Sequence, residues 1–386
     1  MCCVIVKEYS TGENGVQSGV ERVSMKRSVL HIVESFGGGV FTYLVNLCGC
    51  LHEEFDLTVA YSRRGETPDD VAAHFPPNVR LIELRHGQRS LHPWKDWLYS
   101  REIAALVRSS RPDVVHLHSS KAGFAGRMVL NPRRTRVLYT PHGYAMLKTD
   151  ESPLKRRLYR ALERVAARPG TLTVGVGQSE YEAALELTGR AVYIPNGIRI
   201  DEMPPPRWPG ASLPSPRVGT LSRMTYAKAP ERFNRVAQAL PDVAFTWIGD
   251  GELRGELTAE NIAVTGWMDR ASGIAALNGL DVFLLPSRWE GLPLSLLEAM
   301  YLGKLCIASD IPSLRSILRH GENGLLARDD EDFARLLREV REGRWDVPAM
   351  AARAHADVCE RYNTGVMGTE YAKLYRGEED ADGRTR

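Results

Sequence analysis

The chain has 386 residues, of which 43% are hydrophobic and 25% are charged, and its formal net charge at pH 7 is +2. These values are average for a globular protein and exclude a disordered, collagen-like or coiled-coil chain, while the length predicts two domains. The sequence lacks the uninterrupted run of about 18 apolar residues that marks a membrane-spanning helix.

Charge is distributed unevenly along the chain. Residues 26–200 contain 25 basic and 17 acidic residues, whereas residues 201–386 contain 23 and 28. A mildly basic first half is too weak a signal for nucleic acid and favours a partner that carries phosphates, or an anionic lipid surface.

The six cysteines are scattered, without a CxxC pair or histidines at zinc spacing. We therefore expect a reduced, cytoplasmic setting rather than a disulfide framework.

Residues 1–25 are polar and lack a hydrophobic period, so they are predicted to be a disordered tail, or sequence upstream of a true start at Met25. Short apolar runs then alternate with longer segments whose apolar residues follow the period of a helix, among them residues 40–51, 96–107 and 154–167. The alternation and the apolar strands predict a doubly wound α/β domain with a parallel sheet over residues 26–200. Its predicted strands are 29–33, 57–60, 79–82, 114–117, 137–139, 172–176 and 192–194.

Prolines interrupt this pattern over residues 201–216, which we interpret as a linker because the segment cannot hold a helix or a central strand. A second alternation predicts a second doubly wound domain over residues 217–360. Helical residues run from 349 to 375, and their last part, 361–376, is expected to pack back on the first domain. Residues 377–386 form a second predicted tail. The predicted strands of the second domain are 217–221, 244–248, 262–264, 282–285 and 305–308.

Ligands of such sheets bind beyond the carboxyl ends of the strands, so the loops after strands are the candidate sites. The first of these loops contains Gly37, Gly38 and Gly39, which would allow the backbone to approach a ligand closely. The loop lacks both the GxGxxG spacing of dinucleotide folds and the lysine of a P-loop, so neither NAD nor ATP cleavage is supported. A plain tight turn is the alternative.

Histidines follow two neighbouring strands. His116 and His118 end one strand, and we expect them to face opposite sides, which would prevent them from sharing a metal ion. A packed histidine is the expectation for His116. His142 stands beside Gly143 in the loop after the next strand, and it is a candidate for contact with substrate.

The predicted helix 154–167 is basic and amphipathic. Arg156, Arg160 and Arg164 recur at four-residue steps, with leucines among the apolar positions. A solvated outer face is the common meaning of such a pattern. Contact with lipid phosphates or with an acceptor is the functional alternative.

Two cations stand on the first loop of the second domain. Arg223 follows the strand 217–221, and Lys228 precedes the next helix. A guanidinium can bind phosphate through two hydrogen bonds, and an ammonium adds a mobile point charge, so an anion between them is one interpretation. Solvated loop charges are the other.

The most informative segment runs from Asp281 to Met300. A buried strand ends at Pro286, a glycine turn follows, and Pro293 is predicted at the first helical position. The free amides of the helix start and the helix dipole would favour a phosphate there. Glu290 precedes the helix and Glu298 lies inside it, but two glutamates at this spacing are a weak signal alone, and a surface role stays open.

Together these residues resemble a known family. The segment from Ser287 to Gly303 resembles the E-x7-E signature of retaining glycosyltransferases with the GT-B fold, family 4. The resemblance covers residues 28–376 and implies two Rossmann-like domains that face a central cleft, with the donor mainly in the second domain and the acceptor in the first. Other segments agree in the expected order, namely Gly37–Gly39, Asp113–Ser120, Pro141–Gly143, Ile194–Ile198, Arg223 with Lys228, Gly249–Glu252 and Gly266–Trp267.

The resemblance also implies roles. Arg223 and Lys228 would neutralise the donor diphosphate, Glu290 would hold the donor sugar, and His142 would contact that sugar near the reacting carbon. These four residues are the expected catalytic ones. Glu298 would bind the ribose. Further contacts are implied for the diphosphate at Gly38, Gly39, Leu292 and Leu294, and for the base at Gly266 and Trp267.

The implied chemistry needs neither a metal ion nor a cofactor, since the nucleotide-sugar is a substrate and positioned cations bind the charge that grows on its diphosphate. We expect a retaining hexosyltransferase that moves a sugar, from a UDP-sugar by preference, to a saccharide or a lipid-diphosphate-linked saccharide in cell-surface polysaccharide biosynthesis. The expected place is the cytoplasm, at the inner face of the membrane. A non-hydrolysing UDP-sugar epimerase with the same fold and a non-catalytic nucleotide-sugar binding protein are the alternatives.

Overall fold

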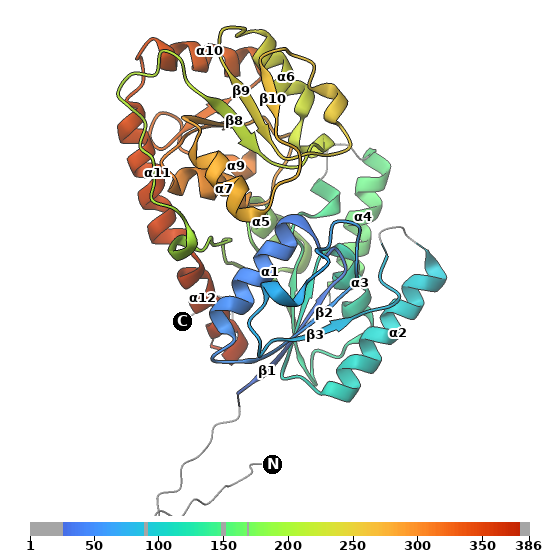
Figure 1. Ribbon diagram of the computed structural model, residues 1–386. Helices are drawn as coiled ribbons and strands as arrows, with labels where there is room; N and C mark the ends of the chain where they lie inside the picture. The colour runs from blue at the N-terminus through green and yellow to red at the C-terminus, as the bar shows by residue number, and fades with distance from the viewer. Residues whose placement is uncertain (1–25, 89–91, 148–151, 168–169, 379–386) are drawn as a thin grey trace, which may run out of the picture.

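The structure is a computed structural model that describes residues 26–88, 92–147, 152–167 and 170–378. The predicted tails therefore lie outside the described residues, apart from Gly377 and Glu378. Two α/β domains lie one above the other, the N-terminal domain at the bottom and the C-terminal domain at the top of Figure 1. Among the described residues, no helix combines the length and the hydropathy needed to cross a bilayer.

The N-terminal domain is built on a seven-stranded sheet in the order β3-β2-β1-β4-β5-β6-β7, with every pairing parallel. Its strands are β1 Ser28–Val33, β2 Asp56–Tyr61, β3 Arg80–Glu83, β4 Val114–His118, β5 Arg136–Thr140, β6 Thr171–Gly175 and β7 Ala191–Tyr193. Its helices are α1 Gly38–Leu51, α2 Pro93–Ser110, α3 Ser120–Val129, α4 Pro153–Ala166 and α5 Gln178–Thr188, with short 3-10 turns at Ala72–His74 and Ala145–Leu147.

The C-terminal domain repeats this plan with six parallel strands in the order β10-β9-β8-β11-β12-β13. Its strands are β8 Val218–Leu221, β9 Phe245–Ile248, β10 Ile262–Val264, β11 Val282–Leu285, β12 Leu305–Ser309 and β13 Leu325–Ala327. Its helices are α6 Pro230–Gln238, α7 Arg270–Asn278, α8 Leu294–Tyr301, α9 Pro312–Arg315, α10 Asp330–Arg341 and α11 Val347–Arg361, with 3-10 turns at Ile200–Glu202, Tyr226–Lys228 and Arg254–Glu256.

Both strand orders reverse direction at one point, between β1 and β4 in the first sheet and between β8 and β11 in the second. In open α/β sheets a crevice forms beyond the carboxyl ends of the strands at such a point. The loops after β1, β8 and β11 carry the glycines, the two cations and Glu290. The topology therefore explains why segments far apart in sequence gather at the same cleft.

Each sheet is buried on both faces. All five residues of β4, of β6 and of β12 are buried, as expected for parallel strands covered by helices on either side. Apolar clusters lie on both faces of each sheet, and one of the N-terminal clusters includes residues from the last helix, α12 (Thr364–Arg376).

The chain crosses between the domains twice, and the two crossings touch. The N–H of Ile198 donates to the carbonyl of Tyr362 at 3.0 Å, and the N–H of Thr364 donates back to the carbonyl of Ile198 at 3.0 Å. Beyond this point α12 packs beside α1, where the hydroxyl groups of Tyr371 and Tyr43 lie 2.5 Å apart. Figure 1 shows α11 descending along the upper domain and α12 lying against the lower one.

Three details of the structure differ from the prediction. The predicted helical run 349–375 is two helices, because Asn363 caps α12 with its side chain, which accepts a hydrogen bond from the N–H of Val366. β13 was not predicted, since three residues after a glycine give no period to read. Pro293 is the cap residue of α8 rather than its first helical residue.

Candidate active site

Arg223 lies directly opposite the glycine loop of the other domain. A methyl group placed on Gly38 would lie 3.9 Å from Nε of Arg223. Gly38 also has a φ of +52°, a conformation that glycine adopts without strain. Nη1 of Arg223 lies 3.9 Å from Oε1 of Glu66, and space around Gly39 is open. The guanidinium thus lies against the glycine loop of the other domain, and about half of the Arg223 side chain (49%) is exposed to an incoming anion.

Lys228 forms an ion pair with Glu290. Nζ of Lys228 lies 2.6 Å from Oε1 of Glu290, and the hydroxyl of Ser287 donates to the same oxygen at 2.6 Å. The loop of Lys228 is tied to the loop of Glu290 by a further bond, from the N–H of Arg288 to the carbonyl of Ala227 at 2.8 Å. Two predicted catalytic residues are therefore in contact, on loops that follow β8 and β11.

The start of α8 offers free amides beside this pair. Among the described residues, no hydrogen bond engages the N–H of Leu294 or of Ser295. Leu292 is buried, and its carbonyl accepts a hydrogen bond from Nδ2 of Asn196 at 2.9 Å. A helix start with unpaired N–H groups and a positive dipole end favours an anion.

Glu298 is buried inside α8 and paired with Arg270. Nη1 of Arg270, the first residue of α7, lies 2.8 Å from Oε1 of Glu298. Trp267 is 67% exposed, and Gly266 pairs with Gly249 through an isolated bridge. The predicted nucleoside residues thus lie on α8 and on the loop between β10 and α7.

His142 lies in a constrained loop after β5. It has a φ of +52°, which is uncommon for a residue with a side chain. Its conformation is fixed from both sides, because the next N–H, of Gly143, donates to Oε1 of Glu180, and the ring Nε2 of His142 lies 3.0 Å from Nδ1 of His118.

Glu180 connects this loop to the other domain. It is buried, its Oε2 accepts from the N–H of Val176 at 3.2 Å, and burial raises its pKa to about 7. A methyl group on Gly291 would lie 3.3 Å from Oε1 of Glu180, and one on Gly177 would lie 2.8 Å from the carbonyl oxygen of Gly291. The loops of His142 and Glu290 therefore face each other across this carboxylate.

The prediction that His116 and His118 face opposite sides is wrong. Residues two apart in a strand share a face, and their ring centroids lie 4.0 Å apart. His31, His116 and His118 form a buried cluster whose ligand atoms lie within 4.8 Å of one another. Both nitrogens of His116 already contact protein oxygens, Tyr375 and Thr140, at 2.8 Å each. These hydrogen bonds fit a packed network better than a metal site.

The three arginines predicted for membrane or acceptor contact differ in their surroundings. Nε of Arg156 donates to the carbonyl of Met146 at 3.1 Å, and Arg160 lies 3.6 Å from Glu186. Arg164 is exposed, and no partner is found for it among the described residues. Two of the three therefore hold the helix to the domain.

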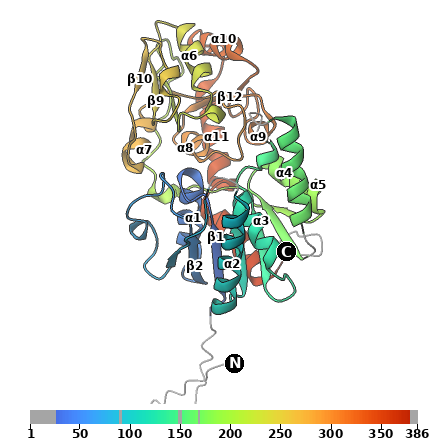
Figure 2. The ribbon, with the colours of Figure 1, turned by 90° about the vertical axis from the view of Figure 1, so that its right-hand side faces the viewer.

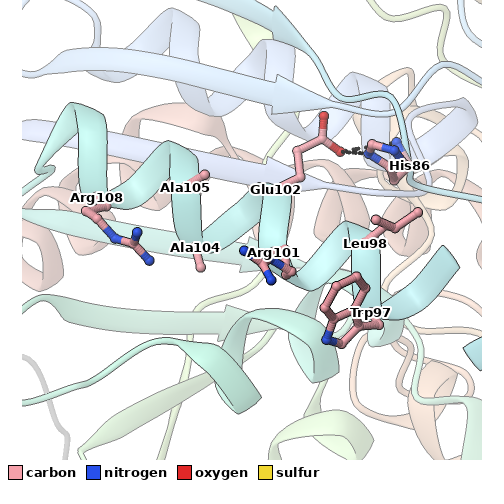
Figure 3. A pocket seen from close by; sticks show the side chains of 8 residues that line it. All are labelled: His86, Trp97, Leu98, Arg101, Glu102, Ala104, Ala105 and Arg108. Atoms are coloured by element: carbon pink, nitrogen blue, oxygen red, sulfur yellow. Dashed lines mark hydrogen bonds and ion pairs between the residues drawn. The ribbon is translucent and has the colours of Figure 1, made fainter. Parts of the chain in front are cut away.

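A hollow lies on α2 of the N-terminal domain. It has a volume of about 640 Å³ and is lined by α2 residues together with His86, whose Nδ1 lies 3.1 Å from Oε2 of Glu102 (Figure 3). Trp97 borders it and stacks on Trp94 with ring centroids 4.9 Å apart. None of the residues predicted for the site lines this hollow.

Several residues of the arrangement were not predicted, namely Glu66, Glu180, Arg270, Ser287 and His31. Only Glu180 gives a signal in the sequence, as an acid in the first turn of a helix that follows a buried strand. Chemically, the site joins two cations and free helix amides on one side of a cleft with a fixed histidine loop on the other. Such a site can bind a diphosphate and stabilise charge that develops on it.

Two family models match the chain. Residues 38–197 match the glycosyl transferase 4-like domain, and residues 215–342 match the glycosyl transferases group 1 family. The boundary between the two matches falls beside the first crossing between the domains.

Relatives and solved structures agree with these matches. The chain is 28% identical over 363 residues to the UDP-Gal:α-D-GlcNAc-diphosphoundecaprenol α-1,3-galactosyltransferase of Escherichia coli, covering 85% of this chain and 86% of the relative. Sucrose-phosphate synthase from Thermosynechococcus elongatus superimposes with a TM-score of 0.74 at 18% identity over 91% of this chain and 99% of its own. The structure of Anabaena HepE in complex with UDP and glucose superimposes with a TM-score of 0.73 at 17% identity, over 91% of this chain and 100% of its own. The likenesses confirm the predicted fold of two Rossmann-like domains facing a cleft.

Proposed function

We propose that this chain, which is a glycosyltransferase with the GT-B fold, moves a sugar from a UDP-sugar to a saccharide carried on a lipid diphosphate, with retention of anomeric configuration. The observation that carries the proposal is that two cations of one loop lie at the domain boundary, Arg223 opposite Gly38 of the other domain and Lys228 paired with Glu290 in the loop that leads into α8. A guanidinium, an ammonium and unpaired N–H groups at a helix start are the kinds of donor that bind the phosphates of a nucleoside diphosphate.

The donor and acceptor classes draw support from the comparisons. The Escherichia coli relative is named for UDP-Gal as donor and for a saccharide on diphosphoundecaprenol as acceptor. HepE has been solved with UDP and glucose. Glu298 would then bind the ribose, and Trp267, which is largely exposed, would lie beside the base.

The carboxylates near the reaction centre favour attack from the front face. Oε1 of Glu290 is engaged by both Lys228 and Ser287, and each oxygen of Glu180 accepts a hydrogen bond from a backbone N–H. We therefore assign the role of nucleophile to neither carboxylate. The bond between C1 and the phosphate oxygen breaks while the acceptor oxygen bonds to C1 on the same face, and the acceptor proton passes to the departing diphosphate, which leaves as UDP. Arg223 and Lys228 bind the charge that grows on that diphosphate, so we propose a metal-independent reaction.

The outer face of α4 fits a lipid surface. Leu154, Leu158 and Val165 are 77%, 52% and 62% exposed, and their spacing puts them on one face of the helix. Arg157 and Arg164 border this apolar stripe and are exposed. The opposite face is held to α3, where Nη2 of the buried Arg127 lies 2.6 Å from Oε2 of Glu163. The apolar stripe, rather than Arg156 and Arg160, is the part of α4 that we propose contacts the membrane.

A second helix extends this surface. Trp94 and Trp97 are exposed at the start of α2, and α3 packs against both α2 and α4; Figure 2 shows all three helices on the side that faces the viewer. Tryptophan is common at membrane interfaces. We propose that this surface, defined by Trp94, Trp97, Leu154, Leu158 and Val165, holds the enzyme at an anionic bilayer that carries the acceptor.

The experiment incubates the purified protein with UDP-, GDP- and ADP-sugars, with and without a saccharide linked to a polyprenyl diphosphate. UDP release that requires the acceptor, with sugar incorporated into the lipid and the same anomeric configuration by NMR, is the expected result. An isomerised sugar nucleotide without acceptor would make the protein an epimerase instead. Binding of UDP-sugar without either product would make it a binding protein.

A parallel reaction contains EDTA. We expect the rate of transfer to stay the same, because the two cations and the helix amides supply the positive charge that a metal ion would otherwise bring. A rate that falls with EDTA and returns with added Mg²⁺ or Mn²⁺ would contradict metal independence while leaving the transfer itself intact.

A further inference from the structure

Three imidazole rings form a continuous hydrogen-bonded line from the core of the N-terminal domain to the cleft. Nδ1 of His31, on β1, lies 3.0 Å from Nε2 of His118, at the end of β4. Nδ1 of His118 lies 3.0 Å from Nε2 of His142. Consecutive rings are also stacked, with centroids 5.3 Å apart in both pairs.

All three rings are neutral near pH 7. Burial lowers the pKa of His31 and of His142 to about 3, and it lowers the pKa of His118 well below its usual value. A neutral imidazole has one N–H donor and one bare acceptor nitrogen. Because each of the two hydrogen bonds needs one proton, the line has only two arrangements. Either all three rings carry the proton on Nδ1, or all three carry it on Nε2.

The two arrangements differ at the ends of the line. Nε2 of His31 is buried without a hydrogen-bond partner. In the second arrangement it would be a buried unpaired N–H, whereas in the first it is a bare lone pair, and orphaned N–H groups are the rarer of the two in proteins. At the other end, Nδ1 of His142 has no protein partner among the described residues and is not fully buried, so a proton there can be satisfied by water or a ligand.

We propose that His31 and His118 are positioning residues that fix His142 as the Nδ1–H tautomer, so that His142 presents a hydrogen-bond donor, and no base, to the cleft. A donor at this place suits an oxygen of the transferred sugar. It cannot accept the acceptor's proton, which agrees with transfer of that proton to the departing diphosphate. The tautomer follows from the hydrogen bonds alone, whereas its effect on transfer rests on the proposed function.

The direct test is the protonation state of each ring nitrogen in the wild-type protein, read from long-range ¹H–¹⁵N NMR spectra with labelled histidine. The three rings are assigned with the variants His31→Gln, His118→Gln and His142→Gln, since each variant lacks the signals of one histidine. We expect a proton on Nδ1 in all three and no titration between pH 5.5 and 8. A proton on Nε2 of His142, or a mixture of tautomers, would overturn the proposal.

The kinetic test compares two equally buried histidines of one strand. His118→Leu removes the donor to His142, and we expect a mixture of tautomers at His142 and about a tenfold lower kcat, partly restored in His118→Gln, whose amide can donate to Nε2. His116→Leu is the control, because His116 is buried beside His118 but outside the line. An equal loss of kcat in both leucine variants, with His142 unchanged by NMR, would reduce His118 to a structural role. If no transfer is found but Nδ1–H is observed, the tautomer stands and the proposed function fails.

Discussion

Lys228 and Glu290, which lie 62 positions apart in the sequence, form an ion pair of 2.6 Å at the point where the loops after β8 and β11 meet. The pair orients the ammonium and keeps it next to the start of α8. We predict that Lys228→Met and Arg223→Met each lower kcat/KM by about 10²- to 10³-fold, because each removes a positioned cation that binds the departing diphosphate. Initial rates with UDP-sugar and acceptor measure this.

The matched control for these variants is Arg335→Met on α10, which breaks the ion pairs of an exposed arginine with Asp332 and with Glu339, the latter of similar length at 2.7 Å, at a place outside the cleft. It should leave kcat/KM unchanged. If Arg223→Met and Lys228→Met lose stability in proportion to their loss of activity, as followed by urea unfolding, the two residues are structural and their assignment to the diphosphate is wrong.

A substitution of Glu298 should weaken binding of the nucleoside without weakening binding of the diphosphate. We predict that Glu298→Ala raises the Kd for UDP by about tenfold, since a carboxylate hydrogen-bonded to ribose hydroxyls contributes about 1.5 kcal/mol. Affinity for inorganic pyrophosphate should not change. Calorimetric titration with both ligands measures this, and a matching loss for pyrophosphate would mean that Glu298 acts through the helix start rather than through the ribose.

The buried carboxyl of Glu180 should make the unfolding free energy of the protein depend on pH. Burial raises its pKa from 4.5 to about 7, so the folded protein holds the proton more tightly than the unfolded chain. The resulting stabilisation is fully present below pH 4.5 and is lost as pH rises through 7. Relative to Glu180→Gln, which cannot ionise, the wild type should lose up to about 3 kcal/mol of unfolding free energy over this range. Urea denaturation from pH 4.5 to 8 measures the difference.

The same helix provides the control for that series. Glu182 is exposed on α5, and the same pH series with Glu182→Gln is the control for a glutamate on the surface of that helix. A difference between the wild type and Glu180→Gln that stays constant with pH would mean that the Glu180 carboxyl ionises at an ordinary pH in the folded protein.

The lipid surface can be tested without the reaction. Leu154→Ser with Leu158→Ser should abolish flotation with vesicles that contain phosphatidylglycerol, because each exposed leucine contributes about 1.5–3 kcal/mol when it enters the bilayer interface. Leu185→Ser, at an exposed leucine of α5, is the control. Transfer to a water-soluble acceptor should continue in both. Vesicle binding that survives the double substitution would exclude α4 as the contact.

The strands were predicted well where apolar runs are bounded by turns. Residues 262–264 and 282–285 were predicted with the bounds that β10 and β11 have, because short apolar runs bounded by turn residues favour strands. The break between α11 and α12 was missed, since only Tyr362 and Asn363 interrupt the helical pattern. His116 and His118 were given opposite faces although the two-residue period of a strand puts them on the same one.

Site residues were predicted only where they lie in a recognisable sequence motif. Arg223, Lys228, Glu290 and Glu298 could be named because strand, glycine turn and helix start follow one another in the sequence. Their partners could not, since the pairing of Glu298 with Arg270 depends on how two helices pack. Glu180 was passed over for a related reason, because an acid in the first turn of a helix usually faces water and only the fold buries it.

The central claim is that this cleft binds the diphosphate of a nucleotide-sugar, and a crystal structure of the protein with UDP tests it most directly. The account predicts that the phosphate oxygens lie within hydrogen-bond distance of the Arg223 guanidinium, the Lys228 ammonium and the N–H groups of Leu294 and Ser295, opposite Gly38. A diphosphate bound elsewhere, with these groups turned away from it, would contradict the account.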